Sequence, residues 1–223
     1  MLRKLKESIK IRLKKALDQT NLITKSVDIG SDAYISGCHI TGEVIIADNC
    51  NIYQSNIEGK IKIGQYSSIW GPNININGNI DIGKFCSIAR GVSIQEYNHD
   101  SDRLSSYYIF KNLFKDETIN ENSTKGPIII GSDVWIGMHS CILSGVRIGN
   151  GAIIAANSVV NSNIPDFAIA AGNPAKVLKY RFSEEIIQLL DEIKWWNWPI
   201  DKIKRNKSYF KDKLTIEKIQ SVE

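Results

Sequence analysis

Aliphatic residues recur at every sixth position in the second half of the chain, and this period constrains the fold more than any other feature. The recurring residues are Ile130, Ile136, Ile142, Ile148, Ile154 and Val160. A period of six matches neither the 3.6 residues of an α-helical turn nor a two-residue alternation. The pattern returns upstream in residues 63–74 and 76–93, and less regularly in 29–34 and 46–51. A short internal repeat of this kind predicts a solenoid in which each coil stacks on the one before it.

Each hexapeptide has an aliphatic residue first, usually Gly or Ala second, and a small or modest residue fifth. Because positions one and five differ by an even number, both side chains point to the same face of an extended segment. We therefore expect this pair to fill the interior of the solenoid. Cys50, Cys86 and Cys141 are assigned to the small interior position, which predicts buried structural thiols. With Cys38 they form no CxxC pair, so no zinc cluster or other metal site is expected.

The length and composition indicate one domain of ordinary size. The chain has 223 residues, of which 43% are hydrophobic. No stretch approaches the roughly 18 consecutive apolar residues of a membrane span, and the cationic N-terminus has no uninterrupted apolar core typical of a secretory signal. The sequence therefore predicts an intracellular, cytoplasmic protein.

The positive charge is concentrated at the N-terminus. Residues 1–20 hold seven Lys or Arg and two acidic residues, whereas the whole chain has a formal net charge of +4. The rest of the chain is thus slightly acidic, which argues against a nucleic-acid surface. The apolar residues of the segment recur at helical spacing, at Leu2, Leu5, Ile9, Leu13 and Leu17. Residues 1–22 are predicted to form a basic amphipathic helix that either packs on a subunit, which we favour, or lies on an anionic membrane surface.

Three further motifs accompany the repeat. They are GKFCSIARGVSI, followed by NH, a long insertion and GPIIIGSDVWIGMHSCILSGVRIG; NIPDFAIAAGNPAKVLKYRF (163–182); and SEEIIQLLDEIKWWNWPIDKI (183–203). In order and spacing they resemble the xenobiotic acetyltransferase branch of the hexapeptide-repeat acyltransferases, whose members acetylate chloramphenicol, streptogramins or sugars. The resemblance covers about residues 60–203.

This resemblance implies an all-β solenoid, a left-handed parallel β-helix with three hexapeptides in each coil. We expect the β-helix over residues 23–175, with roughly five coils and an active-site loop at 95–127. The basic helix at 1–22 precedes it, and a C-terminal helical tail at 176–223 follows it. The resemblance also implies a homotrimer whose acceptor and coenzyme sites lie between adjacent subunits.

The interruption of the repeat at residues 95–127 is expected to form the active site, since insertions in a solenoid project from one face and often bind ligands. His99 lies near its start and matches the catalytic histidine of the family. A hydroxyl is too weakly acidic to attack a thioester unaided, and a neutral imidazole, with an ordinary pKa near ~6.5, can accept its proton at physiological pH. Glu96, Asp100, Asp102 or a backbone carbonyl would orient the ring, and the sequence does not choose among them.

Other site residues are implied by the resemblance. For acetyl-CoA these are Trp135, Gly137, Ala155 as a backbone partner of the pantetheine arm, and Lys176 near the phosphates. The repeat by itself also requires small residues at positions such as Gly137 and Ala155, and a lysine in the place of Lys176 can equally be a solvated side chain. For the acceptor the carried-over residues are Asn98, and Tyr66 and Trp70, which the resemblance implies contact the acceptor in a neighbouring subunit. His39 and His139 gain no such support and are interpreted as structural or solvated.

The predicted reaction is direct transfer in a ternary complex, because no nucleophilic triad is visible and packing accounts for the cysteines. A backbone N–H along a coil would stabilise the oxyanion of the tetrahedral intermediate. Our first hypothesis is an acetyl-CoA-dependent O-acetyltransferase that acts on a sugar hydroxyl, in surface-polysaccharide or nodulation-type oligosaccharide modification. The antibiotic-modifying relatives tend toward NHRMDG and a Tyr-Pro-Phe stretch, whereas this chain has NHDSDR and SSYYIF.

Four other functions are alternatives to this hypothesis. They are antibiotic O-acetylation, N-acetylation of an amino sugar, a hexapeptide-repeat carbonic anhydrase and a non-catalytic solenoid. The carbonic anhydrase would need three zinc histidines, and the close histidine spacing expected for that family is absent. A non-catalytic solenoid leaves the long loop without an explanation.

Overall fold

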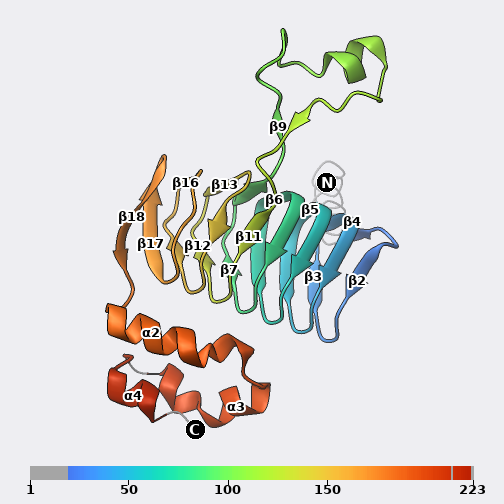
Figure 1. The fold of residues 1–223 in the computed structure, drawn as a ribbon. Helices are drawn as coiled ribbons and strands as arrows, with labels where there is room; N and C mark the ends of the chain where they lie inside the picture. The colour runs from blue at the N-terminus through green and yellow to red at the C-terminus, as the bar shows by residue number, and fades with distance from the viewer. Residues whose placement is uncertain (1–19, 212, 222–223) are drawn as a thin grey trace, which may run out of the picture.

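The computed structural model describes residues 20–211 and 213–221, and these form a parallel β-solenoid with a projecting loop and a group of C-terminal helices (Figure 1). The strands before the loop are β1 (Leu22–Ile23), β2 (Val27–Ile29), β3 (Tyr34–Ser36), β4 (His39–Ile46), β5 (Asn51–Ile63), β6 (Ser68–Ile82), β7 (Ser87–Ile88) and β8 (Ser93–Gln95). The loop contains β9 (Asn98–His99), a π-helical turn (Phe110–Phe114) and β10 (Asn122–Ser123). The expected all-β solenoid with an inserted loop is confirmed.

The solenoid resumes after the loop and ends in a hairpin. Its strands are β11 (Ile128–Ile130), β12 (Trp135–Ile136), β13 (Cys141–Leu143), β14 (Arg147–Ile148), β15 (Ile153–Ile154), β16 (Val159–Val160), β17 (Ala168–Gly172) and β18 (Ala175–Tyr180). The helices are α2 (Glu184–Ile193), α3 (Ile200–Arg205) and α4 (Ile216–Gln220), with 3₁₀ turns at Trp195–Asn197 and Lys207–Phe210. β17 and β18 pair antiparallel, so the segment after residue 175 begins with a strand instead of the expected helix.

Parallel pairing stacks the coils directly on one another. One face of the stack runs through Leu22, His39, Asn56, Asn75, Ser93, Cys141 and Val159. Within the described residues this stack contains seven levels, so the expectation of roughly five coils was wrong. The first coils follow each other at intervals of 17, 17 and 19 residues, as the positions Leu22, His39, Asn56 and Asn75 show. A regular coil of three hexapeptides has 18 residues. Because these intervals differ from 18, the six-residue spacing is interrupted between the early coils, and a count based on that spacing misses them.

The core has the composition that the repeat predicts. First-position residues such as Ile136, Ile142 and Ile154 have no exposed surface. The fifth-position residues are also buried, and they are Val134, Ser140, Val146, Ala152 and Ser158. The hydroxyls of Ser140 and Ser158 donate to the carbonyl oxygen of Ala155, so both buried hydroxyls have a hydrogen-bond partner. The alternation of an extended chain therefore sorts the residues between core and surface.

Glycine at the second position follows from the distance between coils. A Cβ on Gly83 would lie 2.6 Å from the carbonyl group of Gly131 in the next coil. Since strands in a sheet are separated by only about 4.8 Å, a turn that stacks directly on another turn has no space for a side chain there.

The expectation of buried thiols is confirmed for Cys50 and Cys86 and is wrong for Cys141. Cys38, Cys50 and Cys86 are buried, whereas Cys141 is partly exposed. The assignment of Cys141 to the small interior position was wrong. Ser140 holds the fifth position, so Cys141 is sixth and its side chain points outward, like that of Trp135 one hexapeptide earlier.

Burial of Cys86 predicts a loss of stability at alkaline pH. Burial raises the pKa of the Cys86 thiol from 9.0 to about 12, against weaker opposing hydrogen bonds. Above pH 9 the unfolded chain releases this proton while the folded chain keeps it, so the contribution is present below pH 9 and is lost at about 1.4 kcal/mol per pH unit toward pH 12. Urea unfolding of the parent and of Cys86→Ala between pH 8 and pH 10.5 should show a flatter dependence in the variant. Parallel curves would contradict the assignment.

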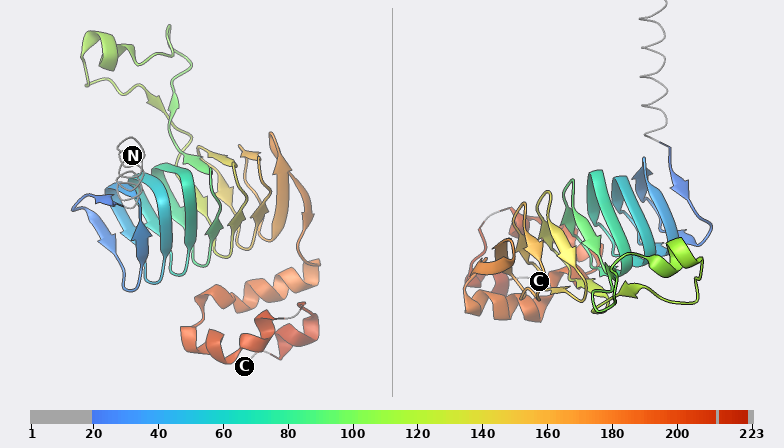
Figure 2. Two further views of the ribbon diagram at one scale, coloured as in Figure 1. Left: turned by 180° about the vertical axis from the view of Figure 1, so that it is seen from behind. Right: turned by 90° about the horizontal axis from the view of Figure 1, so that it is seen from above.

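Turns of the coils form three corners with different surroundings. At the helix corner, backbone hydrogen bonds connect the turns that contain Tyr66, Phe85, Asp133 and Phe167, and Phe85 packs on Trp195 of the C-terminal segment at 4.9 Å between ring centroids. At the loop corner, Gly42, Gly59 and Gly78 are stacked and the loop leaves the coil. The third corner contains Pro72, Arg90, His139 and Asn157. Figure 2 shows the loop and the C-terminal helices on opposite sides of the solenoid.

The ends of the chain bear on two further expectations. Residues 1–19 lie outside the described residues, so the predicted basic helix is not described, and Leu22, expected at its end, lies in β1. Within the part of the chain that the structure describes, no helix is long and apolar enough to cross a membrane.

Candidate active site

The stems of the loop are joined into a short ribbon. β9 pairs antiparallel with β10, and His99 is opposite Asn122 in this register. The coil leaves its path after Gln95 and resumes it at Ile128, which pairs with Ile80 of the preceding coil. The stack therefore continues across the insertion, and it places His99 just outside the loop corner.

Glu96 fastens the base of the loop to the solenoid. Its side chain is buried, with one carboxylate oxygen accepting from the backbone N–H of Asn79 at 2.6 Å and the other from the hydroxyl of Thr124 at 2.8 Å. The Thr124 hydroxyl also lies 3.2 Å from that of Ser144 in the following coil. This carboxylate thus connects the outgoing stem, the returning stem and the coil beneath them.

A backbone carbonyl orients the imidazole of His99. Its Nδ1 lies 2.6 Å from the carbonyl oxygen of Ser106, and its ring packs on Tyr108 with 4.2 Å between ring centroids. A carbonyl oxygen only accepts, so Nδ1 carries the proton of the neutral ring and Nε2 carries the lone pair. The described residues provide no hydrogen-bond partner for Nε2. The His99 ring is therefore in the tautomer that a general base needs.

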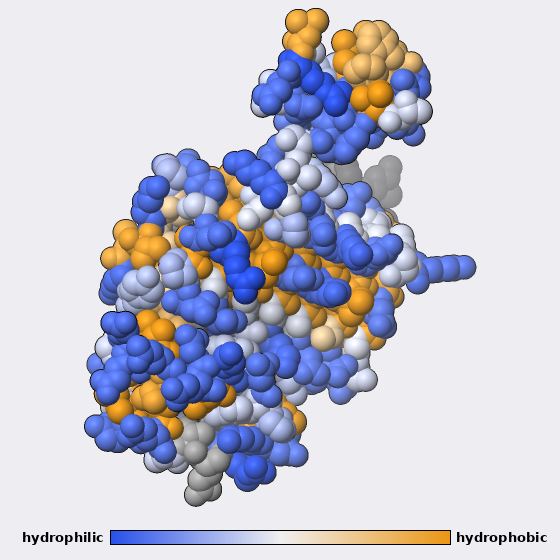
Figure 3. Space-filling model, in the orientation of Figure 1, coloured by the Kyte–Doolittle hydropathy of each residue, from blue (hydrophilic) through white to orange (hydrophobic). Residues whose placement is uncertain are grey.

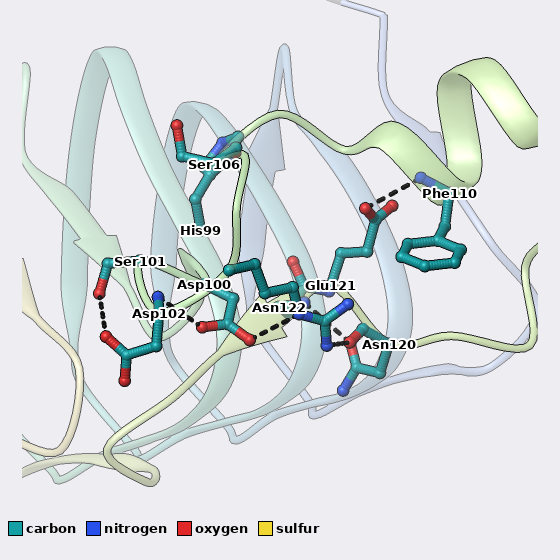
Figure 4. A network of polar contacts seen from close by, with 10 residues as sticks. His99, Asp100, Ser101, Asp102, Ser106, Phe110, Asn120, Glu121 and Asn122 are labelled. Carbon is teal, nitrogen blue, oxygen red and sulfur yellow. Dashed lines mark hydrogen bonds and ion pairs between the residues drawn. The ribbon is translucent and has the colours of Figure 1, made fainter.

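The carboxylates that flank His99 have other partners (Figure 4). Asp100 accepts from the backbone N–H of Asp102 and pairs with Arg103 at 2.8 Å, and these two contacts lower its pKa. Arg103 also donates to the carbonyl of Asn120 across the loop. Glu121 accepts from the backbone N–H groups of Phe110 and Lys111. The group that orients the His99 ring is therefore the Ser106 carbonyl, and the carboxylates stabilise the loop.

A polar groove lies beside His99. Its volume is about 630 Å³, and it is lined by Asn56, Glu58, Gly59, Asn75, Asn77, Gly78, Gln95, Tyr97, Asn98, His99, Tyr108 and Asn122. No Lys or Arg is among these lining residues. Asn77 donates to Glu58 and the Tyr108 hydroxyl donates to Asn122, whereas the side chains of Asn56 and Asn75 make no hydrogen bond within the described residues. The groove can therefore offer amide groups to a polar ligand.

The residues carried over for the coenzyme lie away from this groove, on the face between the helix corner and the third corner and at the third corner itself. Trp135 is 53% exposed on β12, at the outward position that the alternation predicts. Gly137 follows it, and a Cβ there would lie 2.5 Å from the backbone nitrogen of Ala156 in the next coil. Lys176 is exposed on β18 opposite Ala171. Stacking alone thus requires Gly137, whereas Trp135 and Lys176 are available to a ligand.

Ala155 is engaged within the solenoid. Its N–H donates to the carbonyl of Ala170, and its carbonyl accepts from two serine hydroxyls. A pantetheine arm would have to compete with these bonds, so the structure gives Ala155 no free backbone group for the role that the resemblance implied.

The three acceptor residues carried over from the resemblance occupy different places. Asn98 lines the groove beside His99. Tyr66 stacks on Phe85 at the helix corner, with 5.2 Å between ring centroids. Trp70 is 56% exposed near the third corner and packs against Tyr53. Only Asn98 is close to His99 of the same chain.

Neither of the other histidines shares the surroundings of His99. The His139 ring packs over Gly91 at the third corner, and exposed His39 lies on β4. Among the described residues, no three His, Cys, Asp or Glu side chains gather in a position to hold a metal ion.

Sequence reasoning missed the residues that shape the groove. Ser106 and Tyr108 act on His99 through the path of the loop, which no periodic pattern predicts. Asn56 and Asn75 occupy consecutive levels of one face. Their outward positions beside buried Ile57 and Ile76 were a signal that could have identified them.

The hexapeptide repeat connects the chain to known transferases. The family model described as bacterial transferase hexapeptide (six repeats) matches residues 127–162. A chloramphenicol acetyltransferase from Morganella morganii is 36% identical in an alignment of 165 residues that covers 65% of this chain and 79% of the relative. The chain therefore belongs to the hexapeptide-repeat acetyltransferase family, with its left-handed β-helix, and it is an acyltransferase.

Two further matches extend this comparison. A protein from Escherichia coli named for O-acetyl transfer in lipopolysaccharide biosynthesis is 38% identical over 101 residues, covering 45% of this chain and 50% of the relative. The solved structure of a hexapeptide transferase family protein from Anaplasma phagocytophilum has a TM-score of 0.52 at 19% identity. It covers 80% of this chain and 94% of its own, and it supports the fold alone.

Proposed function

We propose that the protein is an acetyl-CoA-dependent O-acetyltransferase acting on a sugar hydroxyl, with His99 as the general base. The observation that carries this proposal is the free Nε2 of His99 beside a groove lined by neutral amides and two tyrosines. Amide groups pair with the vicinal hydroxyls of sugars, and the amphipathic faces of tyrosines suit pyranose rings. The lipopolysaccharide relative agrees with this acceptor class.

The proposed reaction uses the tautomer that the Ser106 carbonyl selects. Nε2 of His99 takes the proton from the acceptor hydroxyl while its oxygen attacks the thioester carbonyl carbon of acetyl-CoA. The tetrahedral intermediate then collapses, the carbon–sulfur bond breaks, and the departing thiolate receives the proton from the imidazolium. The Nδ1–H···O=C bond persists throughout and keeps the ring in position.

Antibiotic acetylation is the second candidate, favoured by the chloramphenicol acetyltransferase relative. A polar groove with a carboxylate at Glu58 is a poor match for a largely apolar antibiotic. The deciding experiment measures release of CoA thiol from acetyl-CoA with neutral sugars, amino sugars, oligosaccharides and chloramphenicol as acceptors. Faster turnover with chloramphenicol than with every sugar would overturn the proposal.

Acetyl-CoA is proposed to lie along the face that ends at the third corner, against Trp135 and Lys176. Lys176→Ala is expected to weaken acetyl-CoA binding about five- to tenfold, the effect of one charge-assisted phosphate contact. Acceptor affinity should stay nearly unchanged, and binding of dephospho-CoA should fall less. Lys179→Ala, an exposed lysine on the same strand, is the control. Equal losses for acetyl-CoA and dephospho-CoA in a titration would place Lys176 away from the terminal phosphate.

The proposed catalytic unit is a homotrimer. His99 lies at the loop corner, whereas Trp135 lies on the face between the other two corners and Lys176 near the third corner, so one chain does not present both halves of the site at the same edge. The loop also exposes the large apolar side chains of Leu104, Tyr107, Leu113 and Phe114. Figure 3 shows hydrophobic surface on the loop, which a neighbouring subunit would cover.

Light scattering should give three times the chain mass of 25.0 kDa. An active monomer would rule out a site shared between subunits. We further propose a cytoplasmic location. The basic segment at residues 1–20 is the part of the chain suited to the face of a membrane.

A further inference from the structure

The groove beside His99 continues away from the loop. A second hollow of about 660 Å³ is lined by Thr20, Leu22, Gly37, Cys38, His39, Gln54, Ser55, Asn56, Pro72, Asn73, Ile74 and Asn75. It shares Asn56 and Asn75 with the groove that contains His99. The two hollows thus meet along one face of the solenoid.

The length of this joined groove exceeds one sugar ring. Leu22, His39, Asn56 and Asn75 line the joined groove on successive levels, and the three steps between them span about 14 Å at the spacing of parallel strands. A single pyranose ring is much shorter than this span. In Figure 2 the loop runs toward the N-terminal coils, which is the direction in which the groove extends.

The chemistry of the lining is neutral and polar. The side chains of Asn56 and Asn75 point outward from β5 and β6 without a hydrogen-bond partner among the described residues. Glu58 is the one carboxylate among the residues that line the two hollows, and no Lys or Arg lines either. A nucleotide sugar carries a diphosphate that such a lining leaves unpaired and that Glu58 repels.

From this continuity we propose that the acceptor is a neutral oligosaccharide, which extends from His99 across Asn75 and Asn56 toward His39, and not a sugar nucleotide. This inference rests on the proposed function for the sugar nearest His99. The sugars further along bind through the two asparagines, and they determine which chains the enzyme accepts.

Binding of neutral tetrasaccharides of glucose, galactose, mannose and N-acetylglucosamine would test the proposal, with the corresponding methyl glycosides and UDP-sugars as comparisons. The parent protein is titrated in the presence of CoA, so that no acetyl transfer occurs. At least one tetrasaccharide should bind at least about tenfold more tightly than its methyl glycoside, since each additional hydrogen bond contributes about fivefold. UDP-sugars should bind no more tightly than the methyl glycosides.

The variants separate the groove from the reacting site. Asn56→Ala and Asn75→Ala should each weaken tetrasaccharide binding about fivefold, and should weaken methyl glycoside binding by a smaller factor. Asn51→Ala is the matched control, because Asn51 is an exposed residue of β5 on another face of the solenoid. If the protein bound the methyl glycoside and the tetrasaccharide of each of the four sugars with equal affinity, the inference would be overturned. Tightest binding of a UDP-sugar would also overturn it.

Acetyl transfer, measured separately, distinguishes the two proposals. Sugar acetylation without any dependence on chain length refutes the extended groove and supports the proposed function. Asparagine-dependent binding of a tetrasaccharide without acetylation of any sugar refutes the proposed function and supports the groove.

Discussion

His99→Ala is expected to lower turnover by about 10²–10⁴-fold, the usual contribution of a positioned general base. The free Nε2 accepts the proton of the attacking hydroxyl, and no other side chain within the described residues contacts the ring in a way that could replace it. Affinity for acetyl-CoA should change little, because the imidazole acts on the acceptor. The measurement is turnover of the purified variant with an acceptor identified by the screen.

Two comparisons make this result specific. The fold and oligomeric state of His99→Ala should match those of the parent, since the side chain is exposed and substitutions at such positions usually change stability by less than about 0.5 kcal/mol. Asp102→Asn should keep turnover within about threefold, because Asp102 contacts Ser101 and Asp100 and leaves His99 untouched. A rate for His99→Ala within about threefold of the parent, well short of the general-base factor, would exclude the mechanism.

Ile80→Ala is expected to destabilise the fold by about 2–5 kcal/mol, the cost of a large cavity in a core that cannot collapse. Ile80 is completely buried on β6 and stands in register with Ile61 on one side and Ile128 on the other. It therefore joins the coil before the loop to the coil after it. The loss corresponds to a fall in Tm of roughly 2–4 °C for each kcal/mol in a chain of this size.

Asp81→Ala is the control for Ile80→Ala. Asp81 is the next residue on the same strand, and its exposed side chain points away from the core. Calorimetry should show a large shift for Ile80→Ala and a shift within about 0.5 kcal/mol for Asp81→Ala. Equal Tm values for the two variants would mean that the coils on either side of the loop do not share one core.

The fold was predictable because its rule is local. Each hexapeptide specifies an inward position, a turn and an outward position without reference to the rest of the chain. The same rule indicated that Trp135 is exposed and that Val134 and Ala152 are buried, which the structure shows. The rule gave the wrong result for Cys141, which holds the sixth position of its hexapeptide and not the fifth. It also gave too few coils, because intervals of 17 and 19 residues interrupt the six-residue spacing.

The candidate site was predictable only in part. An interrupted repeat marked the loop, and its first histidine marked His99, because an insertion into a solenoid must leave the stack at a definite residue. The partner of His99 was not predictable, since the Ser106 carbonyl reaches the ring through the irregular path of the loop. Glu96 had been considered as an orienting group, yet it is buried beneath the loop and binds Asn79 and Thr124.

The sequence by itself determined which side chains face the core, where the solenoid is interrupted and which histidine stands at the interruption, because each depends on a period or its absence. Only the tertiary structure decided the tautomer of His99, the separation of the loop corner from the third corner, and the union of Asn56 and Asn75 with His99 in one groove. These features join residues from different coils. Their positions depend on the register between strands of neighbouring coils and on the path by which the loop returns. A repeat of six residues predicts neither of these.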